Sequence, residues 1–298
     1  MYRSILVPLD GSALAERALA VASALASRFG SDLHIGHVLS KRVTDELPVY
    51  GLTGDAAHAA AEQYVLAAAD RLRAAQPSHV SSTLLEGSPA SAIVEYATKA
   101  GIDLIVMSSH GRTGASRFWL GSVTDAVMRG APIPVLMVRG SADATAKVGG
   151  LFERLLVPLD GSALAESVIP HAVALAKVTA AHIHLLQVEE RAEDLRASVW
   201  GIAAHEPDDL PARLEHADHY LHALVARLQT DVAPATVSVE ARGGHRIGEA
   251  IAQVATEREI DLIAMTTHGR GASRLLTGSV ADKVIRGTEC SVLLYRAR

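Results

Sequence analysis

The chain contains the sequence LVPLDGSALAE twice, at residues 6–16 and again, letter for letter, at residues 156–166. A second pair of related stretches follows: DLIVMSSHGRTGASRFWLGS begins at Asp103 and DLIAMTTHGRGASRLLTGS begins at Asp261. Two matched blocks in the same order indicate a duplicated domain. Each block is expected to join a strand to a helix through a loop, and such junctions are where α/β proteins hold ligands.

The duplication sets the domain boundaries. A length of 298 residues is typical of about two domains, and residues 140–150 (GSADATAKVGG) have the small, polar composition of a flexible tether. We therefore predict a first domain at residues 1–140, a linker at residues 141–150 and a second domain at residues 151–298.

Composition excludes several classes of protein. The formal charge is −5 and basic residues are spread along the chain, which argues against a nucleic-acid-binding face. Cys290 is the only cysteine, so an intramolecular disulfide is excluded; its apolar run, residues 290–295, indicates a buried strand thiol. The first strand is expected near Arg3, leaving no room for a secretory leader, and no apolar stretch suits a membrane span. These features predict a cytoplasmic protein without membrane contact.

Short apolar runs alternate with helical patterns in both halves. In the first half, strands are expected near residues 5–7, 33–39, 80–85, 104–107 and 135–138, and helices from 13 and at 56–75, 90–100 and 122–129. In the second half, strands are expected near residues 155–157, 183–188, 237–241, 262–265 and 291–295. Apolar strands alternating with helices predict an α/β fold, a parallel sheet with helices on both faces and right-handed crossovers.

The first repeated block ends a strand with Asp10, Gly11 and Ser12. A carboxylate at this position can accept hydrogen bonds from ribose hydroxyls or from backbone amides. The alternative is that Asp10 or Ser12 only caps the following helix. The residues alone do not separate these two interpretations.

The second repeated block has the composition of a phosphate-binding loop. Gly111 is followed by nine residues and then by Gly121 and Ser122, which enter a helix. Glycines allow a phosphate to approach the backbone closely, and a helix N-terminus offers free N–H groups and a favourable dipole. The spacing is neither that of a Walker A motif nor that of the clustered glycines of a dinucleotide-binding fold.

With these motifs, the chain resembles the universal stress protein family over both halves. The resemblance rests on VPLDGS, on the SHGRTGASRFWLGS and THGRGASRLLTGS loops, and on the closing PVLMV and SVLLY strands. It implies two Rossmann-like, adenine nucleotide α-hydrolase-like domains, each with a five-stranded parallel sheet of order 3-2-1-4-5. It also implies ATP, ADP or AMP bound between the first and fourth strands, with Mg²⁺ arriving with the nucleotide.

The resemblance assigns a set of nucleotide-binding residues to each half. In the first half these are Pro8, Leu9, Asp10, Val38, Met107, Ser108, His110, Gly111, Arg112, Gly121, Ser122 and Val123. In the second half they are Pro158, Leu159, Asp160, Val188, Met265, Thr266, His268, Gly269, Arg270, Gly278, Ser279 and Val280. The backbones of the two valines at the end of the second strands are expected to contact the adenine.

Both halves depart from the family motif G-x2-G-x9-G-[ST]. Ser108 and Thr266 occupy the position of the first glycine, and only eight residues separate Gly269 from Gly278. A hydroxyl side chain at the first position narrows the pocket but adds a donor. Because the loop of the second half is one residue short, nucleotide binding is better supported in the first half than in the second.

No group in the motifs is identified as catalytic. His110 and His268 could contact phosphate or act as acid–base groups, or each could bond only to nearby backbone. No serine–histidine–acid arrangement indicates a hydrolase, and any ATP hydrolysis is expected to be slow. Histidine pairs on the second strands lack a carboxylate cluster, so no protein metal site is predicted.

Three functions remain: a nucleotide-binding regulator of the stress response, a nucleotide-free interaction scaffold, and an ATP-using enzyme. The resemblance also implies pairing through the fifth strands, so residues 134–138 and 291–295 are expected to pair within one chain. The linker raises the effective concentration of that encounter. Further association of two chains into a homodimer is left open.

Overall fold

The computed structural model describes residues 1–40, 54–74, 79–109, 120–139, 151–191, 209–228, 232–233, 235–267 and 279–296. The chain forms two compact units, Met1–Lys147 (unit 1) and Val148–Ala297 (unit 2). The predicted linker at residues 141–150 lies outside the described residues, so the domain boundaries stay predictions. The expected pairing of the fifth strands stays a prediction as well.

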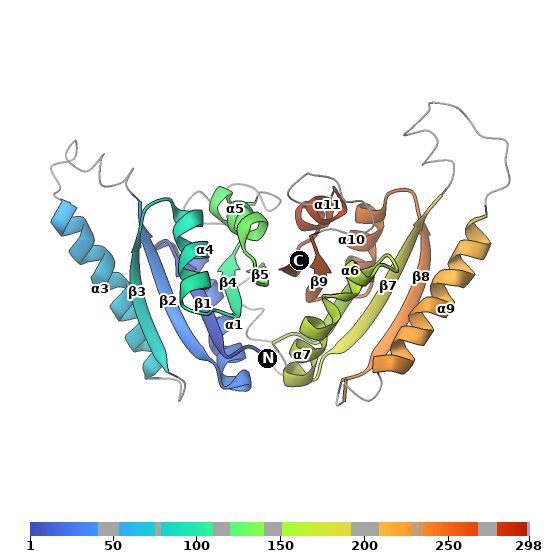
Figure 1. Ribbon diagram of the computed structural model, residues 1–298, viewed down its shortest axis with the longest axis horizontal. Coiled ribbons are helices and arrows are strands. Elements are labelled where there is room, and N and C mark those ends of the chain that lie inside the picture. The colour runs from blue at the N-terminus through green and yellow to red at the C-terminus, as the bar shows by residue number, and fades with distance from the viewer. Residues whose placement is uncertain are drawn as a thin grey trace, which may run out of the picture. The chain divides into compact units, whose positions relative to one another are not determined.

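Unit 1 alternates strands and helices along its whole length (Figure 1). Its elements are β1 (Ser4–Leu9), α1 (Ala13–Phe29), β2 (Asp32–Leu39), α3 (Gly54–Arg73), β3 (Val80–Glu86), α4 (Pro89–Lys99), β4 (Leu104–Ser108), α5 (Ser122–Gly130) and β5 (Val135–Val138). Each strand and helix expected from the sequence is present, and the differences at the ends amount to a few residues.

Unit 2 follows the same order. Its elements are β6 (Arg154–Leu159), α6 (Ala163–Glu166), α7 (Ile169–Thr179), β7 (His182–Glu190), α9 (Leu210–Leu228), β8 (Val237–Gly244), α10 (Ile247–Glu257), β9 (Leu262–Thr266), α11 (Ser279–Gly287) and β10 (Ser291–Tyr295). The first helix is split in two because Pro170, near the start of α7, has no N–H to donate to Glu166.

The strand order confirms the predicted fold in each unit. The described strand pairs within each unit are parallel, and the order is β3-β2-β1-β4-β5 in unit 1 and β8-β7-β6-β9-β10 in unit 2. In unit 1, α1 and α3 cover one face of the sheet and α4 and α5 the other (Figure 1). Ile5, Leu6 and Val7 are fully buried, as expected for a central parallel strand covered on both faces.

The aspartate that opens the second repeated block has a structural role in both units. Asp103 accepts hydrogen bonds from the backbone amides of Arg3 and Ser4, at 2.8 and 3.2 Å. Asp261 does the same for Glu153 and Arg154, at 2.9 and 3.0 Å. These bonds fasten β1 to β4, and β6 to β9, at the amino edge of each sheet, away from the predicted ligand site.

The glutamate that closes the repeated eleven residues also has a structural role. In unit 1, Glu16 of α1 accepts hydrogen bonds from Tyr64 and Arg71 of α3, both at 3.1 Å. In unit 2, Glu166 accepts from Tyr220 and Arg227 of α9, at 3.0 and 2.9 Å. Burial, followed by the nearby glutamate, raises the pKa of each tyrosine, so both phenols remain protonated donors.

Two further expectations bear on the fold. The prediction for Cys290 was wrong: it precedes β10 and is half-buried, with its Sγ 2.8 Å from Thr288 Oγ1. The apolar run 291–295 without Cys290 is the strand, because Thr288 turns the chain before it. Within the described ranges, no helix combines the length and the apolar character that a membrane crossing requires.

Replacing Asp103 with alanine is expected to lower the free energy of unfolding by about 1–2 kcal/mol, because two strand amides lose a charged acceptor. Urea denaturation followed by circular dichroism measures this loss. Glu62→Ala, on the exposed side of α3, is the control and should change the free energy by less than about 0.5 kcal/mol. An equal effect of the two variants would contradict the structural role of Asp103.

Candidate functional site

The candidate site lies at the carboxyl edge of each sheet, where the chain leaves two neighbouring strands in opposite directions. In unit 1 these strands are β1, which continues toward β2, and β4, which continues toward β5. In unit 2 they are β6 and β9. Strand order therefore predicts a crevice between the two exits, which is where ligands bind in open α/β sheets.

The β1 side of the site is a tight turn built by Asp10, Gly11 and Ser12. Gly11 has a φ of 85°, a conformation that glycine adopts without a steric cost. Asp10 Oδ1 accepts from the Ser12 amide at 3.0 Å, and Ser12 Oγ accepts from the Ala15 amide at 3.0 Å. Ser12 therefore caps the helix, as one of the two interpretations of the sequence proposed, and it is the N-cap of α1. Asp10 is half-buried and orders the turn.

Unit 2 repeats this turn with one additional bond. Gly161 has a φ of 77°, and Asp160 Oδ1 accepts from the Ser162 amide at 3.0 Å. Ser162 Oγ also donates to Asp160 Oδ1 at 2.6 Å while it accepts from the Ala165 amide at 3.1 Å. The identical sequence thus gives the same turn in both units and holds each aspartate at the edge of the crevice.

The β4 side of the site is fixed by bonds that reach across the glycine loop. The Gly121 amide donates to the Ser109 carbonyl at 2.8 Å, and Thr124 Oγ1 donates to the Ser108 carbonyl at 2.9 Å. Gly121 is the N-cap of α5 and has no side chain to cap it. The first turn of α5, with Ser122 and Val123, therefore presents backbone amides that its N-cap leaves available for an anion.

Unit 2 lacks one of these braces. Ala281 follows Ser279 and Val280 at the position that Thr124 occupies in unit 1, so it has no hydroxyl to donate to the end of β9. Thr266 and Thr267 at that end are buried, and the Thr267 amide donates to the Tyr295 carbonyl at 3.0 Å. The sequence analysis did not single out Thr124, although the contrast between GSVT and GSVA marks it.

The ends of the second strands differ between the units. In unit 1, His37 Nδ1 lies 2.9 Å from the Leu9 carbonyl and its ring packs edge-on against Tyr64, with centroids 5.7 Å apart. In unit 2 the corresponding residue is Gln187, which pairs with Leu159 and donates to Glu189 at 2.7 Å. These side chains stand beside the valines expected to contact adenine, and sequence reasoning missed them.

Among the described members of the predicted site, Pro8, Leu9 and Met107 are buried in unit 1, and Leu159, Val188, Met265 and Thr266 are buried in unit 2. Asp10, Val38, Ser108, Gly121 and Val123, with Pro158, Asp160 and Val280, are half-buried, and Ser122 and Ser279 are exposed. The remaining predicted members lie outside the described residues: His110, Gly111, Arg112, His268, Gly269, Arg270 and Gly278. The structure thus brings the β1 turn and the start of α5 to one edge, while the glycine loop between them stays a prediction.

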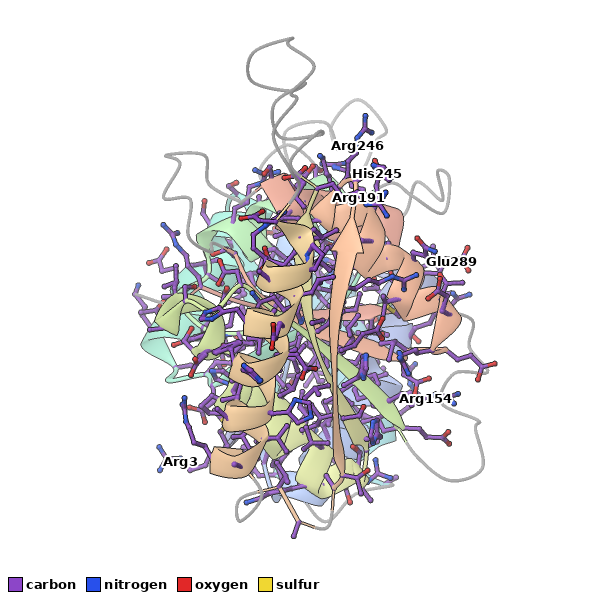
Figure 2. The ribbon with its side chains drawn as sticks, turned by 90° about the vertical axis from the view of Figure 1, so that its right-hand side faces the viewer. Arg3, Arg154, Arg191, His245, Arg246 and Glu289 are labelled. Carbon is purple, nitrogen blue, oxygen red and sulfur yellow. The ribbon has the colours of Figure 1, made fainter. Side chains whose placement is uncertain are left out.

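Basic side chains stand on the same edge of unit 2. Figure 2 shows Arg191, His245 and Arg246 close together where β7 and β8 end. The Arg191 amide donates to the Gly244 carbonyl at 3.3 Å, and Arg246 is bonded to Glu249 at 2.8 Å. Sequence reasoning missed this group because its members belong to separate strand ends.

The histidines of the second strands do not form a metal site in the part of the chain that the structure describes. His34 Nδ1 lies 3.1 Å from both Tyr96 Oη and Ser81 Oγ. His182 and His184 bond to hydroxyls of β8 and of the residue before it. Except for His37, these side chains lie toward the amino ends of their strands, away from the crevice.

Known proteins share this architecture. A solved universal stress protein of Archaeoglobus fulgidus is 20% identical, with a TM-score of 0.71 and 98% of each chain covered, and it has the same fold. A universal stress protein of Methanocaldococcus jannaschii is 33% identical over 141 residues, which are 47% of this chain and 83% of that protein. One of Mycobacterium tuberculosis is 38% identical over 144 residues, and the match spans 46% of that protein.

The family model for universal stress proteins matches the chain twice, at residues 1–139 and at residues 151–296. The two matches fall in the two units, which have the same strand order. The chain belongs to the universal stress protein family, as a member in which the domain is repeated in tandem.

Proposed function

We propose that this protein is a stress-response regulator that binds ATP, ADP or AMP in the crevice between β1 and β4. The observation that carries the proposal is the pairing of two features at one sheet edge. An aspartate is fixed by its own turn on one side, and the start of α5 has a glycine N-cap on the other. These groups match a ribose and a phosphate chain, respectively.

The roles follow from the chemistry of each group. Asp10 accepts from ribose hydroxyls, and Pro8, Leu9 and Met107 form the apolar floor of the pocket, since all three are buried at the strand ends. The backbone of Val38 contacts the base. The amides of Ser122 and Val123 and the Ser122 hydroxyl bind phosphate oxygens, and His110, Gly111 and Arg112 are proposed as further phosphate contacts. Mg²⁺ would arrive with the nucleotide, held by phosphate oxygens.

We propose nucleotide binding in unit 2 as well, on weaker support. Asp160 and the start of α11 repeat the arrangement, but Ala281 removes the hydroxyl brace and the glycine loop is shorter. The basic group Arg191, His245 and Arg246 stands on the same edge of the sheet, at the ends of β7 and β8, with Arg246 paired to Glu249. We propose that the two crevices bind nucleotide with different affinities and that occupancy changes which proteins the chain contacts under stress.

Nucleotide binding is expected to raise the thermal stability of the full chain. At a free MgATP concentration of 100 times the Kd, the free energy of unfolding of the occupied unit should rise by about 2.7 kcal/mol. Differential scanning calorimetry with and without MgATP measures the shift. If ATP, ADP and AMP all leave the transition unchanged, the nucleotide-free scaffold becomes the better description.

A carboxylate at the start of α5 is expected to abolish binding in unit 1. Ser122→Glu places a negative charge where the phosphates bind, yet it suits the helix dipole, so α5 should remain folded. Isothermal titration with MgATP should show a loss of at least about tenfold in affinity. The control is Ala126→Glu, which adds the same charge on the exposed face of the same helix. Equal affinity of both variants would refute the phosphate position.

The matched substitution in unit 2, Ser279→Glu, tests the second crevice separately. If both units bind, each single variant should retain one site per chain and the double variant none, as counted by equilibrium dialysis. If Ser279→Glu leaves the number of sites unchanged, unit 2 does not bind nucleotide through α11.

A further inference from the structure

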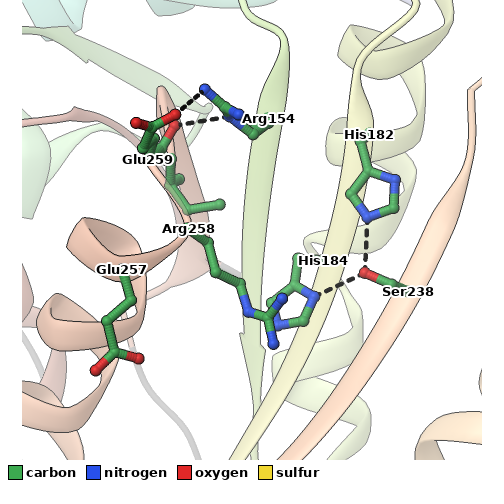
Figure 3. Close-up of a pocket in the computed structure, with 8 residues that line it drawn as sticks. Arg154, His182, His184, Ser238, Glu257, Arg258 and Glu259 are labelled. Atoms are coloured by element: carbon green, nitrogen blue, oxygen red, sulfur yellow. Dashed lines mark hydrogen bonds and ion pairs between the residues drawn. The ribbon is translucent and has the colours of Figure 1, made fainter.

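A continuous hydrogen-bond chain joins the amino ends of β7 and β8 in unit 2, at the opposite edge from the candidate nucleotide site. It borders a shallow pocket of about 290 Å³ lined by Arg154, His182, His184, Ser238 and the residues 257–260 (Figure 3). His182 and His184 lie two apart on one face of β7, and Ser238 of β8 lies between their rings.

The hydrogen-bond chain has five residues, and each is within hydrogen-bond distance of the next. Thr236 Oγ1 lies 2.7 Å from His182 Nδ1, and His182 Nε2 lies 2.6 Å from Ser238 Oγ. Ser238 Oγ lies 2.7 Å from His184 Nδ1, and His184 Nε2 lies 3.2 Å from Glu240 Oε2. Thr236 is exposed, whereas His184 is 2% exposed, so the chain runs from solvent to the interior of the unit.

The Glu240 end fixes which atom of His184 carries the proton. Glu240 Oε2 accepts two hydrogen bonds from the guanidinium of Arg258, one of them from Nε at 2.9 Å. A carboxylate paired with a guanidinium can only accept, so the proton between it and His184 belongs to His184 Nε2. Neutral His184 therefore has a bare Nδ1, which must accept.

The remaining protons follow in sequence. Since His184 Nδ1 accepts, the single hydroxyl proton of Ser238 is directed to it. Ser238 Oγ is then an acceptor toward His182, so His182 carries its proton on Nε2 and has a bare Nδ1. Thr236 must donate to that nitrogen. In the neutral state, all the hydrogen bonds between Thr236 and His184 therefore point inward.

One additional proton can reverse this direction without breaking any bond between Thr236 and His184. A proton from water binds His182 Nδ1 as the Thr236 hydroxyl proton turns aside, so that Thr236 Oγ1 becomes the acceptor in this bond. The Nε2 proton of His182 moves to Ser238 Oγ, and the Ser238 hydroxyl proton moves to His184 Nδ1. His184 is then an imidazolium paired with Glu240, while His182 is neutral again with its proton on Nδ1.

The charged groups around the hydrogen-bond chain affect the pH at which the additional proton binds. Arg258 at the end of α10 faces both histidines, and Glu240 of β8 faces His184, with Arg242 Nη1 3.8 Å from Glu240 Oε1. Burial, followed by Arg258, lowers the pKa of both histidines below the ordinary value of 6.5, while Glu240 partly offsets this for His184.

Two other ion pairs lie at the pocket and add no net charge to it. Arg154 of β6 is paired with Glu259 at 2.7 Å, and Glu257 of α10 is paired with Arg242 at 2.6 Å. The hydrogen-bond chain is therefore surrounded by paired positive and negative side chains. Within it, the two imidazoles are the groups that change charge near neutral pH.

Unit 1 does not contain this chain. Asp32 occupies the position of His182, because Asp32 pairs with Ser4 as His182 pairs with Arg154. His34 is equivalent to His184, and it lies 3.1 Å from Ser81 and from Tyr96. Thr83 replaces Glu240. The two-histidine arrangement is thus specific to unit 2.

We propose that Thr236, His182, Ser238, His184 and Glu240 form a proton-binding site that takes up one proton as a unit and so makes the stability of unit 2 sensitive to acid. The neutral histidines are favoured in the folded state, since their folded pKa values are lower than that of an unfolded histidine. The stabilisation is therefore complete above about pH 6.5 and is lost as the pH falls below it. None of these five residues belongs to the proposed nucleotide site.

The test is ¹⁵N NMR of the histidine rings in the full chain between pH 8 and pH 5. At pH 8, His182 and His184 should both carry their proton on Nε2. On acidification, the proton of His182 should move from Nε2 to Nδ1 at the same midpoint at which His184 becomes doubly protonated. Separate midpoints, or His182 already protonated on Nδ1 at pH 8, would overturn the proposal.

Variants separate the relay from simple burial. Ser238→Ala should abolish the tautomer change at His182, whereas Ser238→Thr, which keeps the hydroxyl, should retain it. If Ser238→Ala does not fold, His184→Gln gives a second measurement. In the wild type, His184 should make the unfolding equilibrium constant rise as the pH falls below 6.5, by at most about tenfold per pH unit. His184→Gln should lose this contribution. His222→Gln, at an exposed site on α9, is the control, and a pH dependence of His184→Gln equal to that of this control would contradict the site.

Discussion

The position of β1 between β2 and β4 is the constraint on which the rest of unit 1 depends. Because β1 is followed by a crossover to one side and β4 by a crossover to the other, the carboxyl ends of these strands border a crevice. Asp103 holds the other ends of the same two strands together through the amides of Arg3 and Ser4. Asp103 thus joins the two strands at their amino ends, and Asp261 does the same in unit 2.

The repeated residues serve the fold as much as the ligand. Within the eleven identical residues, Leu6 and Val7 are core, Asp10 and Ser12 build a turn, and Glu16 joins two helices. Identity between the copies therefore shows which contacts both domains need. Differences between the copies indicate where their functions can diverge, as at Thr124 and Ala281.

The two edges of unit 2 have separate chemistry. The carboxyl edge has Asp160, the start of α11 and a basic group, which suit an anion. The amino edge has neutral imidazoles enclosed by paired charges, which suit a single proton. Helix α10 runs from the carboxyl edge to the amino edge of unit 2. It begins next to Arg246 of the basic group and ends at Arg258 beside the histidines.

The sequence by itself determined the duplication, the family and the residues of the Asp10 turn, because these depend on local patterns and on an ordered repeat. The strand order was implied by the family resemblance and not by the local patterns. The tertiary structure decided the roles that require partners distant in the chain. Asp103 reaches Arg3, Glu16 reaches Tyr64, and His184 reaches Glu240 only after strands and helices have packed. Hydrogen bonds between residues so far apart in the chain leave no periodic signal in the sequence, so the proton chain of unit 2 became visible only in three dimensions.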